Sequence, residues 1–134
     1  MNTEKIGFLA SLGFASMEPE EVLRTLSEIG YKAVEWTLAH LDPRKKSVEE
    51  IKRVVDLTKQ YDMEVSEVVV HQDLVVLDEN MRKKTTDFVS QCIQTFSEAG
   101  ITTISLLNWS LRMGIRCTQD RQGHNRGESL GYGL

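Results

Sequence analysis

Four side chains that could take part in chemistry lie within or directly after short apolar runs of this sequence. Glu35 lies inside one run, His71 ends another, and Asn108 with Trp109 follow a third. A glutamate can orient a hydroxylated substrate or a metal-bound water. A histidine can serve as a metal ligand, a general acid or base, or a hydrogen-bond donor to a sugar hydroxyl, and an indole can stack on a sugar ring. These residue types predict a substrate-binding site for a small polar molecule, with His71 as its candidate metal ligand.

Each of these residues also has a structural interpretation. Glu35 could be half of an ion pair inside a sheet, and His71 could end a strand with its ring satisfied by the backbone. Trp36 and Trp109 are near predicted strand ends, where tryptophans are more often core residues than sugar-stacking ones. Glu67 lies deeper in its run, and we interpret it as structural. A charged Glu67 and a titratable His71 on one side of a strand still favour a polar interior or pocket there, since burying an unpaired carboxylate is costly.

Other polar residues are predicted to be solvated or to form turns. His40 and His124 are interpreted as solvated, and Asp73 as a turn or cap residue. The basic triplet at 44–46 could meet a phosphate, but a short basic cluster before an acidic helix start is typical of a solvated loop. The sequence has no dinucleotide motif, no phosphate-binding glycine loop and no nucleophile elbow. This counts against nucleotide binding and serine hydrolysis.

The elements that must position these side chains are short strands alternating with helices. Strands are predicted at Lys5–Leu9, at Ala33–Thr37, in the valine-rich run that opens at Glu64, and at Ile101–Leu107. We expect the valine-rich strand to be buried on both faces, because helical patterns flank it on both sides. A spacing of roughly 30 to 40 residues between strand starts predicts βαβ units and a parallel sheet. Ligands bind at the carboxyl ends of such strands, so we expect the site there.

Three helices are predicted between the strands, with a loop at 38–46. The first opens at Glu18-Pro19 and ends at Gly30; its apolar positions are Val22, Leu23, Leu26 and Ile29. The second opens with a capping box at Ser47; its apolar positions are Val48, Ile51, Val54, Val55 and Leu57. Asp78 or Asn80 caps the third, which closes at Gly100; its inner positions are Met81, Phe88, Val89, Cys92, Ile93, Phe96 and Ala99.

Length and composition indicate one domain and exclude several classes of partner. The 134 residues suffice for a single core. A net charge of −4 and a pI near 5.4 argue against a nucleic-acid partner. No apolar run approaches the roughly 20 residues of a membrane helix. Cys92 and Cys117 form neither a metal spacing nor a disulfide framework, so the expected location is the reducing cytoplasm.

The character of the sequence changes after residue 109. Residues 110–134 contain half of the arginines, five of the nine glycines and no lysine, without apolar periodicity. One interpretation is a disordered or loosely packed tail. The other is a shift of the reading frame near residue 110, which we prefer as a hypothesis because a strand just before it needs a helix behind it. The predicted organisation is therefore a folded unit at 1–109 and an atypical tail at 110–134.

Four motifs in residues 1–109 give the sequence a family resemblance. They are Ile-Gly-Tyr-Lys-Ala-Val-Glu-Trp at 29–36, Gln-Tyr-Asp-Met-Glu-Val at 60–65, Val70-His71 with the leucines that follow, and Glu-Ala-Gly-Ile-Thr-Thr-Ile-Ser at 98–105. In this order and spacing they resemble the xylose isomerase-like TIM barrels, the sugar phosphate isomerase/epimerase family. The third motif is similar to the histidine-bearing loop of the endonuclease IV branch.

The resemblance implies the first half of a (β/α)8 barrel with its site at the carboxyl ends of the strands. In the complete family fold a divalent metal (Mn, Mg, Co or Zn), held by carboxylates and a histidine, supports isomerisation or epimerisation of a small carbohydrate or polyol. Only Glu35 and His71 carry over, because the main ligands lie on strands five to eight. We therefore expect the chain alone to bind metal poorly.

Two alternatives to the sugar isomerase remain open. One is a non-catalytic α/β domain that self-associates, for example as a homodimer, through open sheet edges. The other is an apurinic-site nuclease, which the loop after His71 favours. The acidic net charge and the run Ser105-Leu-Leu-Asn108, which stands where that branch has a histidine, count against the nuclease.

Overall fold

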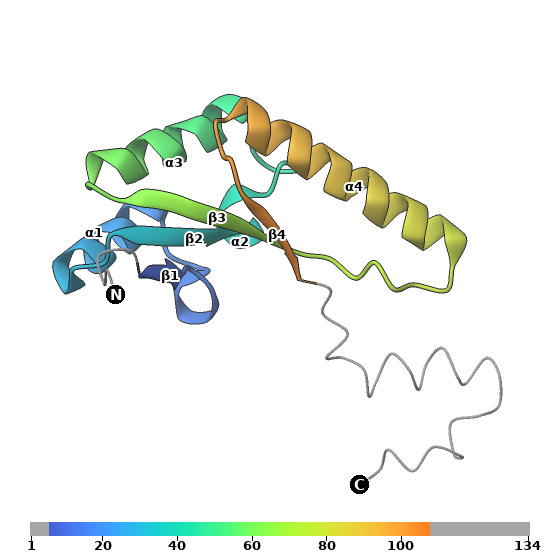
Figure 1. Cartoon of the computed structure of the whole chain (residues 1–134), viewed down its shortest axis with the longest axis horizontal. Coiled ribbons are helices and arrows are strands. Elements are labelled where there is room, and N and C mark those ends of the chain that lie inside the picture. The colour runs from blue at the N-terminus through green and yellow to red at the C-terminus, as the bar shows by residue number, and fades with distance from the viewer. Residues whose placement is uncertain (1–5, 108–134) are drawn as a thin grey trace, which may run out of the picture.

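The described part of this chain contains a sheet of four parallel strands in sequential order. The computed structural model describes residues 6–107. The strands are β1 (Gly7–Leu9), β2 (Ala33–Thr37), β3 (Glu64–His71) and β4 (Ile104–Leu107), and their order in the sheet is β1-β2-β3-β4. The connections contain a short 3-10 helix η2 (Leu12–Phe14) and the helices α1 (Pro19–Ile29), α2 (Leu38–Leu41), α3 (Val48–Gln60) and α4 (Glu79–Glu98) (Figure 1).

This sequential order is the order of consecutive units in a (β/α)8 barrel. A doubly wound sheet reverses its strand order and places helices on both faces. Here the three long helices share one face, since α1, α3 and α4 contribute to the same hydrophobic cluster as Val34, Trp36, Val68 and Val70 of the sheet. The prediction of a parallel α/β fold with about four strands is confirmed.

The long helices begin and end where the local sequence predicts. Gly30 ends α1 with φ of 100°, a left-handed conformation that glycine adopts without strain. At the start of α3, Ser47 Oγ accepts from the Glu50 amide at 3.3 Å and Glu50 Oε2 accepts from the Ser47 amide at 2.7 Å. Asp78 caps α4 by accepting from the Met81 amide at 2.8 Å.

The core lies between the helices and one face of the sheet. Trp36 is fully buried at its centre, and its Nε1 donates to Thr58 Oγ1 at 3.2 Å. Three predicted core positions are wrong: Ile29 is 65% exposed, Met81 56% and Ile93 49%. Ile29 and Met81 lie in the last and first turns of their helices. Ile93 lies on the flank of α4 that faces the open edge at β4.

The central strand is less buried than its composition predicts. Val68, Val69 and Val70 are buried, whereas Glu64 and His71 at the two ends of β3 are exposed. Burial on both faces is therefore wrong for all but the middle of this strand, because no described helix covers the second face. Among the helices of residues 6–107, none combines the length and apolar character needed to span a bilayer. Asn108, Trp109 and the tail at 110–134 lie outside the described residues.

Candidate functional site

Two glutamates lie side by side on the sheet face that points away from the long helices. The register of β2 and β3 pairs Glu35 with Glu67, and that of β1 and β2 pairs Leu9 with Glu35. Alternation along a strand gives Glu35 the face opposite to Trp36. The predicted grouping of Glu67, Val69 and His71 on one face agrees with this register.

A bulge and a glycine create this arrangement. The register shifts between Val34 and Glu35, so Ser66 becomes the extra residue of β3, and its Oγ donates to the Val34 carbonyl at 3.1 Å. Gly7 lies beneath the Glu35 carboxylate: a Cβ at this position would be 3.0 Å from Glu35 Oε1 and 3.1 Å from Ser66 Oγ. Glycine at this position therefore leaves room for the acidic side chain over β1.

The two carboxyl groups give Glu35 an altered proton affinity. Partial burial raises the pKa of Glu35 above its ordinary value, and the negative charge of Glu67 raises it further. Glu35 thus keeps its proton to a higher pH than an exposed glutamate does. A carboxyl group of this kind next to a second carboxyl group is a candidate for general acid–base work. From the sequence, Glu67 was interpreted as structural. The sign of the bulge in the sequence is Ser66, a serine within the valine-rich run.

His71 lies on the same face but not beside the two glutamates. It ends β3 and is four residues beyond Glu67, roughly 13 Å along a strand. The structure therefore does not bring His71 and Glu35 together. Asn108 and Trp109, the other predicted binding residues, cannot be placed because they lie outside the described part of the chain. Asp73 forms the predicted turn, since its Oδ1 accepts from the Val75 amide at 3.2 Å.

The described residues do not assemble the donor set of a metal site. Within residues 6–107 no three His, Cys, Asp or Glu side chains gather as a bound ion would need. The Glu35–Glu67 pair supplies two carboxylates only, and Cys92 is buried in the core with the pKa of its thiol raised to about 11, chiefly by that burial. The metal implied by the resemblance stays a prediction for the complete barrel.

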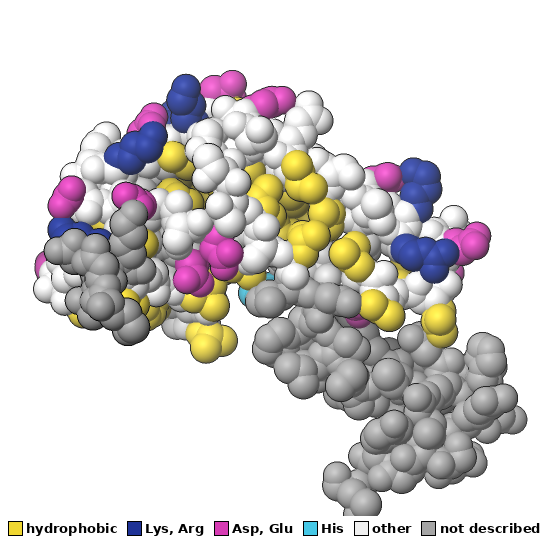
Figure 2. Space-filling view, viewed as in Figure 1, with side chains coloured by type: hydrophobic (Ala, Val, Ile, Leu, Met, Phe, Trp, Pro, Cys, Tyr) yellow, Lys and Arg dark blue, Asp and Glu magenta, His cyan; other side chains and the backbone are white. Residues whose placement is uncertain are grey.

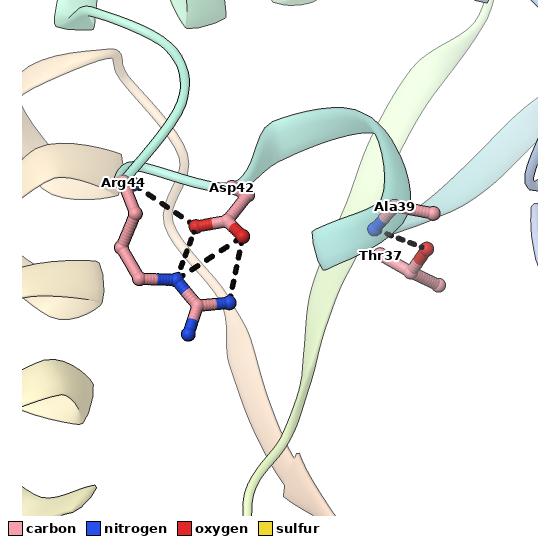
Figure 3. A network of polar contacts seen from close by, with 4 residues as sticks. All are labelled: Thr37, Ala39, Asp42 and Arg44. Atoms are coloured by element: carbon pink, nitrogen blue, oxygen red, sulfur yellow. Dashed lines mark hydrogen bonds and ion pairs between the residues drawn. The ribbon is translucent and has the colours of Figure 1, made fainter.

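His40 is buried, and its predicted solvation is wrong. Its side chain is 3% exposed, and its Nε2 donates to the Phe14 carbonyl at 3.0 Å. Its ring meets the Trp36 ring edge-on with centroids 5.0 Å apart. Residues 38–41 form the helix α2, which was predicted as loop, and Thr37 caps it by accepting from the Ala39 amide at 3.2 Å (Figure 3). The sequence signal that could have indicated the burial of His40 is its apolar neighbours, Leu38 and Leu41.

The loop after α2 is fastened by a buried carboxylate. Asp42 is 3% exposed and accepts from the Arg44 amide, from Arg44 Nε and from Arg44 Nη2, the last at 2.7 Å (Figure 3). These hydrogen bonds hold the pKa of Asp42 below its ordinary value. The Arg44 guanidinium also lies 4.1 Å from the centre of the Phe88 ring on α4. The interpretation of 44–46 as a solvated loop agrees with the exposure of Arg44 and Lys45, and the Arg44 side chain also contacts α4 through Phe88.

The two polar regions thus have different characters. Asp42 is buried against Arg44, which is the arrangement of a structural group, and His40 is buried with its Nε2 bonded to the Phe14 carbonyl, while its Nδ1 has no hydrogen-bond partner among the described residues. Glu35 and Glu67 are half-buried on a face that the long helices leave uncovered.

A comparison with protein-family models finds no match, and a comparison with curated proteins finds none either. The sheet face that carries Glu35 and Glu67 is therefore the candidate functional site.

Proposed function

We propose that this chain forms part of a barrel that isomerises or epimerises a small carbohydrate or polyol on the sheet face opposite the helices. The observation that carries the proposal is the in-register pair of Glu35 and Glu67 on that face, with the pKa of Glu35 raised. The family resemblance of residues 29–36, which include Glu35, supports the same reaction class.

The chemistry of these reactions suits a pair of carboxyl groups. By the proton-transfer route, isomerisation and epimerisation both remove a proton from a carbon beside the sugar carbonyl and return a proton to the neighbouring or the same carbon. In isomerisation a hydroxyl proton also moves to the former carbonyl oxygen. A carboxylate can accept that proton, and a neighbouring carboxyl group with a higher pKa can supply one. We assign this exchange to Glu35 and Glu67. His71 is too far along β3 to reach the same carbon, and we assign to it a hydrogen bond with a more distant hydroxyl.

Deuterium exchange on sugars would test the assignment without assuming which sugar is the substrate. The full chain is incubated in D2O with a panel of ketoses and aldoses, and deuterium at the carbon beside the carbonyl is followed by NMR. We expect exchange with at least one sugar, and a loss of roughly 10²-fold or more in Glu35→Gln, the usual size of a general acid–base contribution.

Glu28→Gln is the matched control, since Glu28 is an exposed glutamate on α1. It should leave the exchange rate unchanged. Exchange that persists in Glu35→Gln, or wild-type exchange no faster than in buffer with every sugar, would contradict the proposed function.

A further inference from the structure

The described sheet has two open edges. β1 pairs only with β2, and β4 only with β3, among residues 6–107. Each edge strand therefore has one row of backbone N–H and C=O groups without a strand partner in this part of the chain. Natural proteins protect such edges by covering them, charging them or pairing them with another strand.

Exposed apolar side chains lie at both edges of the described sheet. At one edge Ile6, just before β1, is 59% exposed. At the opposite edge Leu106 of β4 is 43% exposed and Ile93 of α4 is 49% exposed. By alternation from Gly7 and Ser105, Ile6 and Leu106 both lie on the helix-bearing face. The two edges therefore present the same kind of surface at the two ends of one sheet.

The edge at β4 is also hollowed. A groove of about 540 Å³ runs between α4 and β4. Its lining is mostly apolar and consists of Ile93, Ser97, Gly100, Ile101, Thr102, Ile104 and Leu106. Figure 2 shows hydrophobic side chains gathered between these two elements. A surface of this kind is typical of an interface with another folded element.

We propose that two copies of this chain associate edge to edge, β4 of each copy beside β1 of the other, to close one eight-stranded parallel barrel. A (β/α)8 barrel has eight parallel strands inside and helices outside. The described sheet, with four parallel strands in sequential order and its long helices on one face, corresponds to half of such a barrel. A two-fold axis that relates the two copies produces both contacts together. It places β4 of the first copy beside β1 of the second, and β4 of the second beside β1 of the first. A second copy is the occupant that matches both edges, whereas a segment beyond Leu107 would cover one.

Closure would also complete the candidate site. The uncovered faces of the two copies become the two halves of one barrel interior, so each Glu35–Glu67 pair faces the interior surface of the other copy. This consequence for the site rests on the proposed function. The association itself does not, and association without catalysis would be the self-associating domain considered above.

Light scattering on the full chain, without sugar or metal, tests the association. We expect a discrete species of twice 15.2 kDa that dissociates on dilution. Leu106→Lys and Ile6→Lys each place a charge at one edge, where lysine opposes strand pairing. Each should weaken the dimer at least tenfold. Val75→Lys, at a 69% exposed residue of the loop between β3 and α4, is the matched control and should leave the dimer unchanged. Circular dichroism confirms that each variant is folded.

Three results would overturn the proposal: a monomer at all concentrations, a polydisperse aggregate, or a dimer that both edge variants leave intact. The first is also the result expected if residues beyond Leu107 cover the groove. Deuterium exchange is a separate readout, so a dimer without exchange would contradict the proposed function alone, and exchange by a monomer would contradict the association alone.

Discussion

The two faces of the sheet are built from the same strands and differ in what their side chains do. On the helix-bearing face Val34, Trp36, Val68 and Val70 are all fully buried. On the other face the neighbours of these residues include Glu35 and Glu67, which are half-buried and next to each other. Successive side chains of a strand point to opposite faces, so core residues and candidate site residues alternate along β2.

The energetic consequences of the two faces have opposite signs. Fully burying a large apolar side chain stabilises a fold by about 1.5–3 kcal/mol. Placing two carboxylates opposite each other destabilises it by up to about 1 kcal/mol. The apolar residues of the helix-bearing face therefore stabilise the fold, and the Glu35–Glu67 pair weakens it. A stable scaffold tolerates such a cost at a functional site.

Truncating the central tryptophan should give the largest effect on stability. Trp36→Ala removes a fully buried side chain and leaves the Thr58 hydroxyl without its indole donor. We expect the free energy of unfolding to fall by about 3–5 kcal/mol. Urea unfolding followed by circular dichroism measures the change. Leu12→Ala, at a residue 91% exposed, is the control and should change stability by less than about 0.5 kcal/mol. An equal loss of stability in the two variants would contradict the contrast between buried and exposed positions.

Acid should lower the stability of the fold because it favours protonation of the buried His40. Burial lowers the pKa of His40 below its ordinary value of 6.5, and the nearby Lys46 lowers it further, while the hydrogen bond to the Phe14 carbonyl and the charge of Glu18 oppose the shift. The unfolded chain then binds the proton more readily than the folded chain does. The free energy of unfolding should therefore fall as the pH drops below 6.5.

The effect of His40 can be isolated by comparing two proteins. Urea unfolding at pH 7.5 and 5.5 is measured for the wild type and for His40→Gln, whose amide can still donate to the Phe14 carbonyl. We expect the wild type to lose more stability than the variant between these two pH values, by less than the loss in Trp36→Ala. The same pH dependence in both proteins would mean that His40 is protonated as easily in the folded chain as in the unfolded one.

Removing one charge from the acidic face should give a small change of the opposite sign. Glu67→Gln removes the negative charge that raises the pKa of Glu35. We expect the variant to be more stable than the wild type at pH 7 by a few tenths of a kcal/mol. The pKa of Glu35, followed by NMR, should also fall. A less stable Glu67→Gln variant would show that this carboxylate has a stabilising partner, and the two faces would no longer differ in sign.

The sequence predicted the elements well because their signals are local. The glycine at position 30 and the capping box at Ser47 end and begin helices through contacts within four residues. Apolar periodicity likewise located Val22 and Leu26 in the core. It failed for Ile29, because the pattern continues to the end of α1 while the packing surface does not.

The candidate site was harder to predict because it depends on register. Glu35 was selected from its place in a strand, but its partner Glu67 was interpreted as structural. Their pairing follows from the bulge at Ser66, which depends on how two distant strands align. His40 was misjudged for a related reason: its burial is decided by α2 folding back over β2, and its polar character alone suggested solvation.

The order of the strands has a consequence for how the chain acquires its structure. Within residues 6–107 each strand pairs only with its neighbours in the sequence, so every new pairing closes a loop that ends at an element already formed. The entropic cost of such a closure grows slowly with loop length. During synthesis, when the N-terminal part emerges first, β2 can pair with β1 before β3 exists, and β3 can pair with β2 before β4 exists. We therefore expect the order of strands across the sheet to be also the order in which a growing chain completes them.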